Sequence, residues 1–379
     1  MADTKQLWLQ VEQVGRSDCY HYFLECPKEN LSEFVQNLDK ISNLEAKVGI
    51  VEATARRNDV KPNSPESQIA YDFYKNYGQM QGADINGAVA EELGRKNLNQ
   101  AYEDVTSGKI QQGTALYNAA LTSVCKARSQ SMEKTDNKTY FGCDDKLLNN
   151  SARDKLYSCA VSTGDTNAVA QLVNGGYEDS FAKHAVKDCT EKFGPDACAG
   201  IYANIAANHN ASAETLNDVY NNLKGVKSLY NVASSVDGFA QNPNAPAEIH
   251  NACINFDFNY TSSKGGITQQ VAKVTKNPDV LDTCLAAADY LAKSAKNDTA
   301  AKESNRWPIL KNALENPNLT EAQFEQIKQA DKNRGLQDGY NGYGIGYNSF
   351  SDQLNKVTKS KESSKMAMAM SRGVNEGGR

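Results

Sequence analysis

A short phrase, Asn-Pro followed by Asn or Asp, recurs in the second half of this chain and limits what it can fold into. It stands at Asn242, Asn277 and Asn316, and a variant with His in place of Pro begins at Asn208, so the copies are 34, 35 and 39 residues apart. Because proline disfavours helix in the residue before it, a helix that runs into the phrase should stop at the asparagine. The phrase therefore predicts a corner between helices, repeated once per unit.

Apolar residues precede each corner at helical spacing. Six residues before the four asparagines stand Tyr202, Val236, Val271 and Leu310, and three before them stand Ile205, Phe239, Val274 and Ala313. These two positions share one helix face. We therefore predict units of helix, turn, helix and corner that stack as an α-solenoid over residues 146–333. The alternative is a non-repetitive helical bundle whose loops happen to use Asn-Pro.

The start of the chain has a different pattern. The stretches "QLWLQVEQV" and "CYHYFLEC" are short and rich in aromatic and branched residues, and "GRSD" between them suits a turn. They predict a β-hairpin in the first 26 residues. From Pro27 onward the spacing is helical, so residues 1–130 are expected to form a β-hairpin plus helices, followed by a polar linker at 131–145.

The end of the chain combines closely spaced Gly and Tyr with a basic terminus. Residues 356–379 hold six basic and two acidic side chains. Gly at this density opposes a packed helix, so residues 334–379 are predicted to be a flexible tail. Its tyrosines are the candidate partner-binding residues, namely Tyr340, Tyr343 and Tyr347. The alternative is an inert extension.

Composition points to a globular, soluble protein. The chain has 379 residues, 40% of them hydrophobic and 23% charged, with a net charge of -5. An acidic body disfavours nucleic acid as the main partner, because phosphate binding needs a basic face. No signal peptide or stretch of about 20 apolar residues is visible, so we expect a cytoplasmic protein without a transmembrane segment. An exported protein whose leader precedes this sequence is the alternative.

The nine cysteines show no Cys-x-x-Cys spacing, and their number is odd. We expect buried, reduced thiols, with disulfides as the alternative for an exported protein. Cys189 and Cys198 flank "TEKFGPDA", which predicts two helices joined by a turn at Gly194-Pro195. That arrangement would bring the two Cα atoms towards the range that a disulfide requires.

No catalytic, cofactor-binding or metal-ligating residue is predicted. On a strand, Cys19 and His21 would share a face, whereas Cys26 would point the other way, which is a poor metal geometry. His250 and Cys253 share a helix face, but a single pair is weak evidence for a metal. Phosphate-binding loops, a GxSxG elbow and an HExxH motif are missing from the sequence.

The sequence thus predicts a mainly α protein, and three functions remain open. The first is a non-enzymatic scaffold that uses an α-helical repeat surface to bind a protein or peptide. The second is a structural component of a larger assembly, such as a virion, a secretion apparatus or a surface layer. The third is a hydrolase with an unrecognised site. Homo-oligomerisation is compatible with all three.

Overall fold

The computed structural model describes residues 4–132, 143, 145–174, 177–294, 306–332 and 347–376. Every regular element in these ranges is helical, and none of their helices is long and apolar enough to cross a membrane. Backbone contacts divide the chain into two units, residues 1–176 and 177–379. The division does not fall at the predicted linker 131–145, because the helix before that segment packs on helices after it.

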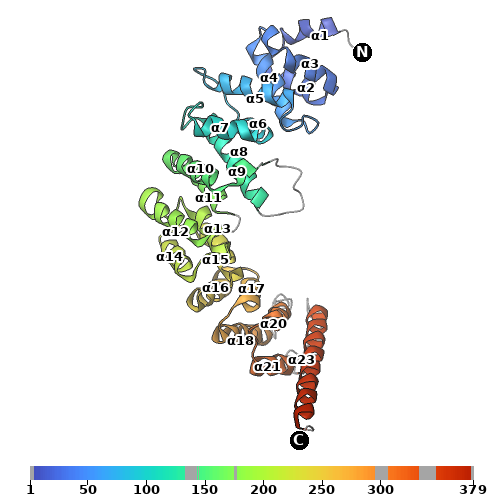
Figure 1. The fold of residues 1–379 in the computed structure, drawn as a ribbon, viewed down its shortest axis with the longest axis vertical. Helices are drawn as coiled ribbons and strands as arrows, with labels where there is room; N and C mark the ends of the chain where they lie inside the picture. Colours follow the sequence, from blue (N-terminus) through green and yellow to red (C-terminus); the bar gives the residue numbers. More distant parts are fainter. Residues whose placement is uncertain are drawn as a thin grey trace. The chain divides into compact units, whose positions relative to one another are not determined.

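In the first unit, one row of helices packs each on the next, and most of the other helices lie against it (Figure 1). The row contains α2 (Arg16–Glu25), α4 (Leu44–Arg56), α6 (Gly87–Lys96), α8 (Ala115–Met132) and α11 (Thr166–Val173). The others are α1 (Thr4–Val11), α3 (Lys28–Gln36), α5 (Pro65–Gly78), α7 (Leu98–Thr106), α9 (Asp145–Leu148) and α10 (Asn150–Thr163).

The second unit has two rows, and successive helices alternate between them. The inner row contains α13 (Ala199–Ala207), α15 (Leu229–Gln241), α17 (Gly266–Val274), α20 (Arg306–Glu315) and α23 (Tyr347–Glu376). The outer row contains α12 (Asp179–Asp188), α14 (Ala213–Leu223), α16 (Ala247–Tyr260), α18 (Pro278–Ser294) and α21 (Glu321–Lys332).

Small residues let neighbouring helices of a row approach closely. A Cβ at Gly49 of α4 would lie 2.9 Å from the Cβ of Cys19 in α2. A Cβ at Gly238 of α15 would lie 2.8 Å from the backbone nitrogen of Ala207 at the end of α13. Both distances are shorter than van der Waals contact, so each crossing requires glycine.

The predicted β-hairpin at the N-terminus is wrong, because both stretches are helices. Leu7 and Val11 are buried, and so are Cys19 and Phe23, and each pair is spaced one helical turn apart. A hairpin alone is marginally stable. As helices, the same residues bury their apolar face against α3 and α4.

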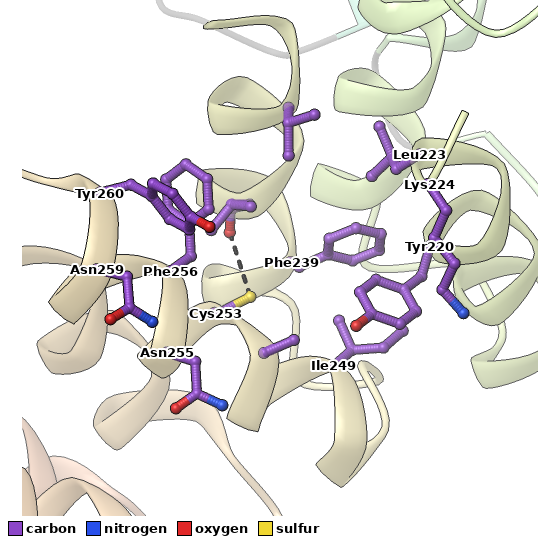
Figure 2. Close-up of a pocket in the computed structure, with 13 residues that line it drawn as sticks. Tyr220, Leu223, Lys224, Phe239, Ile249, Cys253, Asn255, Phe256, Asn259 and Tyr260 are labelled. Carbon is purple, nitrogen blue, oxygen red and sulfur yellow. Dashed lines mark hydrogen bonds between the residues drawn. The ribbon is translucent and has the colours of Figure 1, made fainter. Parts of the chain in front are cut away.

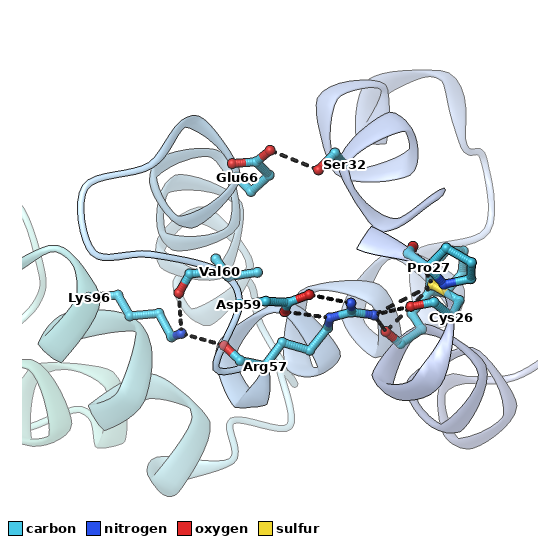
Figure 3. Close-up of polar contacts among 9 residues, drawn as sticks. Cys26, Pro27, Ser32, Arg57, Asp59, Val60, Glu66 and Lys96 are labelled. Atoms are coloured by element: carbon cyan, nitrogen blue, oxygen red, sulfur yellow. Dashed lines mark hydrogen bonds and ion pairs between the residues drawn. The ribbon is translucent and has the colours of Figure 1, made fainter. Parts of the chain in front are cut away.

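Half-buried Arg57 and Asp59 and buried Lys96 hold the connection that follows α4 (Figure 3). Arg57 pairs with Asp59 through two hydrogen bonds of 2.9 and 2.6 Å and donates to the backbone carbonyls of Phe23 and Cys26. The ammonium of Lys96 donates to the carbonyls of Arg57 and Val60, at 2.7 and 2.8 Å. Burial lowers the pKa of Lys96. These contacts tie α2, α4 and α6 together.

The asparagines of the repeated phrase lie between helices, as predicted. Two of them make the same pair of hydrogen bonds to backbone carbonyls. Asn242 is fully buried, and its Nδ2 donates to the carbonyls of Ala206 and Asn208, at 2.8 and 2.9 Å. Asn316 is also buried and donates to the carbonyls of Ala272 and Thr275, both at 2.9 Å. Each of these corners is therefore hydrogen-bonded to the corner before it.

Asn208 and Asn277 complete the series in different ways. Asn208 is buried and donates to the carbonyl of Tyr177 at 2.9 Å. Asn277 is only half-buried, and its Oδ1 accepts from the backbone nitrogen of Asp279 at the start of α18. The corner position that Asn277 was expected to fill belongs to Thr275, whose carbonyl accepts from Asn316. Asn277 thus lies between helices as predicted and shares its Oδ1 contact with the other three asparagines, which also accept from the backbone nitrogen two residues later, but it does not occupy the buried position.

The end of the chain is helical where the structure describes it. Residues 333–346 and 377–379 lie outside the described residues, so the predicted flexibility is not tested there. The expectation that the tail forms no helix is wrong for α23, whose Tyr347, Phe350 and Leu354 are buried. These side chains follow helical spacing, and the dense glycines of the sequence stop at Gly346.

Candidate functional site

The outer row of the second unit is interrupted between α14 and α16. α12 packs on α14, α16 packs on α18 and α18 packs on α21. α14 and α16 make much less contact with one another. The space between them is a groove of about 350 Å³. Among the described helices of the outer row, α14 and α16 are the neighbours that leave α15 of the inner row accessible between them.

Apolar side chains from three helices line the groove (Figure 2). Its floor is Val236 and Phe239 of α15 with Ile249 and Cys253 of α16. Its walls are Tyr220 and Leu223 of α14 on one side and Phe256 and Tyr260 of α16 on the other. The rings of Tyr220 and Phe239 meet edge to face, with centroids 6.3 Å apart, so the floor and one wall form a continuous aromatic surface.

Tertiary contacts tie the end of α14 to the preceding turn. Thr190 hydrogen-bonds the side chain of Asn222 at 3.3 Å, and Asp196 accepts from the backbone nitrogen of Lys227 at 2.8 Å. The ring of Pro195 packs on Gly225, where a Cβ would lie 3.0 Å from Cγ of the proline. The connection between α14 and α15 is thus fixed on the α12–α13 turn and not on α16, which accounts for the gap.

Large apolar side chains remain exposed at the rim. Leu229 is 51% exposed and lies one helical turn before Val232, which lines the groove. Tyr260 is 62% exposed, and its ring lies 5.2 Å from the ring of Phe256. Exposed apolar side chains beside an apolar groove are typical of an interaction site.

Polar groups at the rim supply hydrogen-bonding capacity. Asn255 and Asn259 line the groove, are exposed, and stand one turn apart on α16. Lys224 lies at the opposite wall, where its ammonium bonds the side chain of Asn221 at 2.8 Å and stands 5.2 Å from the ring centre of Tyr220. The rim therefore offers two carboxamides facing one cation across the groove.

The groove contains no activated nucleophile. Burial raises the pKa of the Cys253 thiol, which donates to the carbonyl of Val236 at 3.6 Å. Burial also raises the pKa of Tyr220. Both groups are therefore neutral near pH 7, and a protonated, buried thiol is inert. What the arrangement offers is apolar contact and hydrogen bonding.

Of the three tyrosines predicted to bind a partner, the structure describes Tyr347 alone, and Tyr347 does not line this groove. Tyr340 and Tyr343 are outside the described residues. Tyr347 is buried at the start of α23, where its ring lies 5.0 Å from that of Trp307 and its hydroxyl donates to Asp331 at 3.1 Å. Tyr347 is thus an anchor within the chain itself.

The His and Cys pairs considered from the sequence have different surroundings. Nε2 of His250 donates to the carbonyl of Asn242 at 3.2 Å, which supports a corner. Cys19 is buried, whereas His21 is exposed on α2. Among the described residues, no group of three or more His, Cys, Asp or Glu side chains is placed to hold a metal ion.

The turn predicted between Cys189 and Cys198 is confirmed. Cys189 begins a π-helical turn after α12, Cys198 precedes α13, and Gly194 between them has φ of 82°. Both thiols are buried and free. The pKa of Cys189 is raised by a hydrogen bond with Cys198 and by burial.

Sequence reasoning missed the groove, although one signal was present. α16 already carries core residues at Ile249 and Cys253, yet its second half adds Phe256, Phe258 and Tyr260. This is more aromatic surface than one buried face of a helix needs. Comparison with protein-family models, curated proteins and solved structures finds no match for this chain.

Proposed function

We propose that this protein is a non-enzymatic interaction scaffold whose second unit is an α-solenoid segment, and that the groove between α14 and α16 binds a segment of a partner polypeptide. The observation that carries the proposal is the interruption of the outer row at an apolar groove. The alternation of helices between two rows and the hydrogen bonds that link successive corners support the solenoid architecture.

The groove suits an apolar side chain presented by a peptide backbone. Its volume of about 350 Å³ is at the small end of ligand pockets, and its floor is apolar. The carboxamides of Asn255 and Asn259 each offer a donor and an acceptor, which match the N–H and C=O groups of a peptide backbone. Lys224 across the groove favours an acidic residue next to the apolar anchor.

Selection of peptides on the full-length protein tests this proposal. A random peptide library should yield a consensus with an aliphatic or aromatic anchor beside an acidic residue. A bulky substitution in the groove, Ala252→Trp, should reduce the affinity of the selected peptides at least tenfold. The matched control is Ser234→Trp, at an exposed position of α15 outside the groove, and it should leave the affinity unchanged.

Two results would count against the groove. Selection could enrich no peptide, or the enriched peptides could bind Ala252→Trp as tightly as the unmodified protein. Circular dichroism of both variants, showing the same helical content and melting temperature, excludes unfolding as the cause of lost binding.

A further inference from the structure

A second pocket lies within the first unit, and it is independent of the groove between α14 and α16. It has a volume of about 450 Å³ and is formed by side chains of α2, α4 and the start of α6. Six polar side chains line it, namely Arg16, Ser17, Tyr20, Glu52, Arg56 and Asn86. The groove in the second unit is mainly apolar, so this pocket offers a different chemistry.

A buried carboxylate holds Arg16 in place. Nε and Nη2 of Arg16 donate to the two carboxylate oxygens of Glu52, at 2.9 and 2.5 Å, and the Glu52 side chain is only 8% exposed. Gly49 of α4 lies against the carbonyl oxygen of Arg16 and leaves no room for a side chain between them. Asp84 also accepts from Arg16, at 2.8 Å, but it is 86% exposed, so water screens its charge. The Arg16–Glu52 pair is thus a fixed and nearly neutral wall of the pocket.

Arg56 supplies the pocket with a positive charge that the chain does not pair. It is exposed and lies one turn after Glu52 on α4. Among the described residues, no carboxylate or carbonyl accepts a hydrogen bond from its guanidinium. Each of the other arginines of the first unit has such an acceptor, namely Arg16, Arg57, Arg95, Arg128 and Arg153. The N–H donors of Arg56 are therefore open to a ligand.

Three neutral side chains add donors to the same pocket. Ser17 and Tyr20 stand one helical turn apart on α2, and neither hydroxyl has a hydrogen-bond partner in the described part of the chain. The Oδ1 of Asn86 caps α6 by accepting from the backbone nitrogen of Ala88 at 3.1 Å, which leaves Nδ2 as a donor. Hydroxyl and N–H donors beside a guanidinium are the groups that bind phosphate oxygens.

We propose that this pocket binds the phosphate group of a small phosphomonoester. The guanidinium of Arg56 pairs with two phosphate oxygens, and Ser17, Tyr20 and Asn86 donate to the phosphate from the other sides. These four donor groups match the three terminal oxygens of a phosphomonoester better than the two oxygens of a carboxylate. The volume lies within the range of about 300 to 1,000 Å³ that is usual for ligand pockets, so it also has room for the organic group.

Phosphorus-31 NMR titration of the full-length protein at constant ionic strength tests this, with phenyl phosphate and inorganic phosphate as probes. Phenyl phosphate should bind with a Kd of about 1 mM or below, since water still reaches the ion pair. Arg56→Ala should weaken that binding at least tenfold, and Ser17→Ala should weaken it several-fold. The matched control is Lys40→Ala, which removes the same charge at an exposed position outside the pocket and should leave the Kd unchanged.

Inorganic phosphate distinguishes the two sources of the anion. Weaker binding of inorganic phosphate than of phenyl phosphate supports a phosphomonoester, and the reverse order overturns it. The proposal also fails if phenyl phosphate does not bind at about 10 mM, or if Arg56→Ala binds it as tightly as the unmodified protein. An equal loss in Lys40→Ala and Arg56→Ala would overturn it as well, because the effect would then come from the total charge of the protein.

Discussion

Asn242 should be the most sensitive polar position in the second unit. Its side chain is fully buried, its Nδ2 donates to the carbonyls of Ala206 and Asn208, and its Oδ1 accepts from the backbone nitrogen of Asn244 at 3.0 Å. Asn242→Ala removes three hydrogen bonds and leaves carbonyl groups at a buried corner without their donor. At about 1 kcal/mol per lost bond, the free energy of unfolding should fall by about 3 kcal/mol.

Two further substitutions separate this cause from loss of volume. Asn242→Asp keeps the size and the acceptor oxygen but places a carboxylate oxygen against two carbonyl oxygens, so at pH 7 it should cost more than the alanine. Asn277→Ala removes only the cap of α18 and should cost about 1 kcal/mol.

Urea denaturation followed by circular dichroism, with native-state hydrogen exchange to assign the loss to the second unit, measures all three. An Asn242→Ala cost no larger than that of Asn277→Ala would refute the reasoning. So would an aspartate variant more stable than the alanine variant, because the two donated hydrogen bonds would then contribute little.

The remaining predictions concern other parts of the chain. Burial lowers the pKa of His250 from 6.5, so the unfolded state takes up a proton first; the free energy of unfolding should fall as pH drops below about 6.5, and His250→Gln should remove that slope in denaturation curves. Arg57→Ala should speed hydrogen exchange in α2 and cost about 2 to 3 kcal/mol, whereas Arg56→Ala, at an exposed position, should cost less than about 0.5 kcal/mol; equal effects would contradict the proposed role of the Arg57 hydrogen bonds. A chain ending at Lys332 should expose Trp307, with red-shifted fluorescence and a lower melting temperature, while one ending at Ser364 should show neither change.

The helical class and the corners could be predicted because their signals are local. Proline after Asn242 and Asn316 stops the preceding helix whatever the tertiary surroundings. At Asn277 the predicted corner lies between helices, but Thr275 occupies the buried position there, and a threonine gives no corner signal in sequence. The corner was assigned from the phrase and not from the buried position.

The N-terminal error has a different source. Short apolar stretches fit either period, since Leu7 and Val11 satisfy helical spacing in a segment that is also rich in branched and aromatic residues. The close approach of α2 to α4 at Gly49 favours the helical form. That contact joins residues about 30 positions apart, so no short stretch of the sequence predicts it.

The groove and the α23 contact depend on tertiary arrangement. The gap beside α14 follows from contacts of Asn222 and Lys227 with a turn more than 30 residues earlier. In the tail, the prediction followed the dense glycines and not the three apolar residues at helical spacing. Those residues form a helix because Trp307 offers them a buried surface. The periodicity of a single sequence does not show that the end of α14 contacts the earlier turn, or that the start of α23 contacts Trp307.

The most direct measurement of partner binding at the groove is site-specific photo-cross-linking of a selected peptide. A benzophenone amino acid replaces Tyr260 at the groove rim or Tyr290 on α18, which are 62% and 60% exposed and thus equally accessible. Tyr290 does not line the groove; its ring lies 5.8 Å from that of Phe258, on another face of α16. The account predicts that the peptide cross-links at position 260 and not at position 290. Equal cross-linking at both positions, or cross-linking at 290 alone, would contradict it.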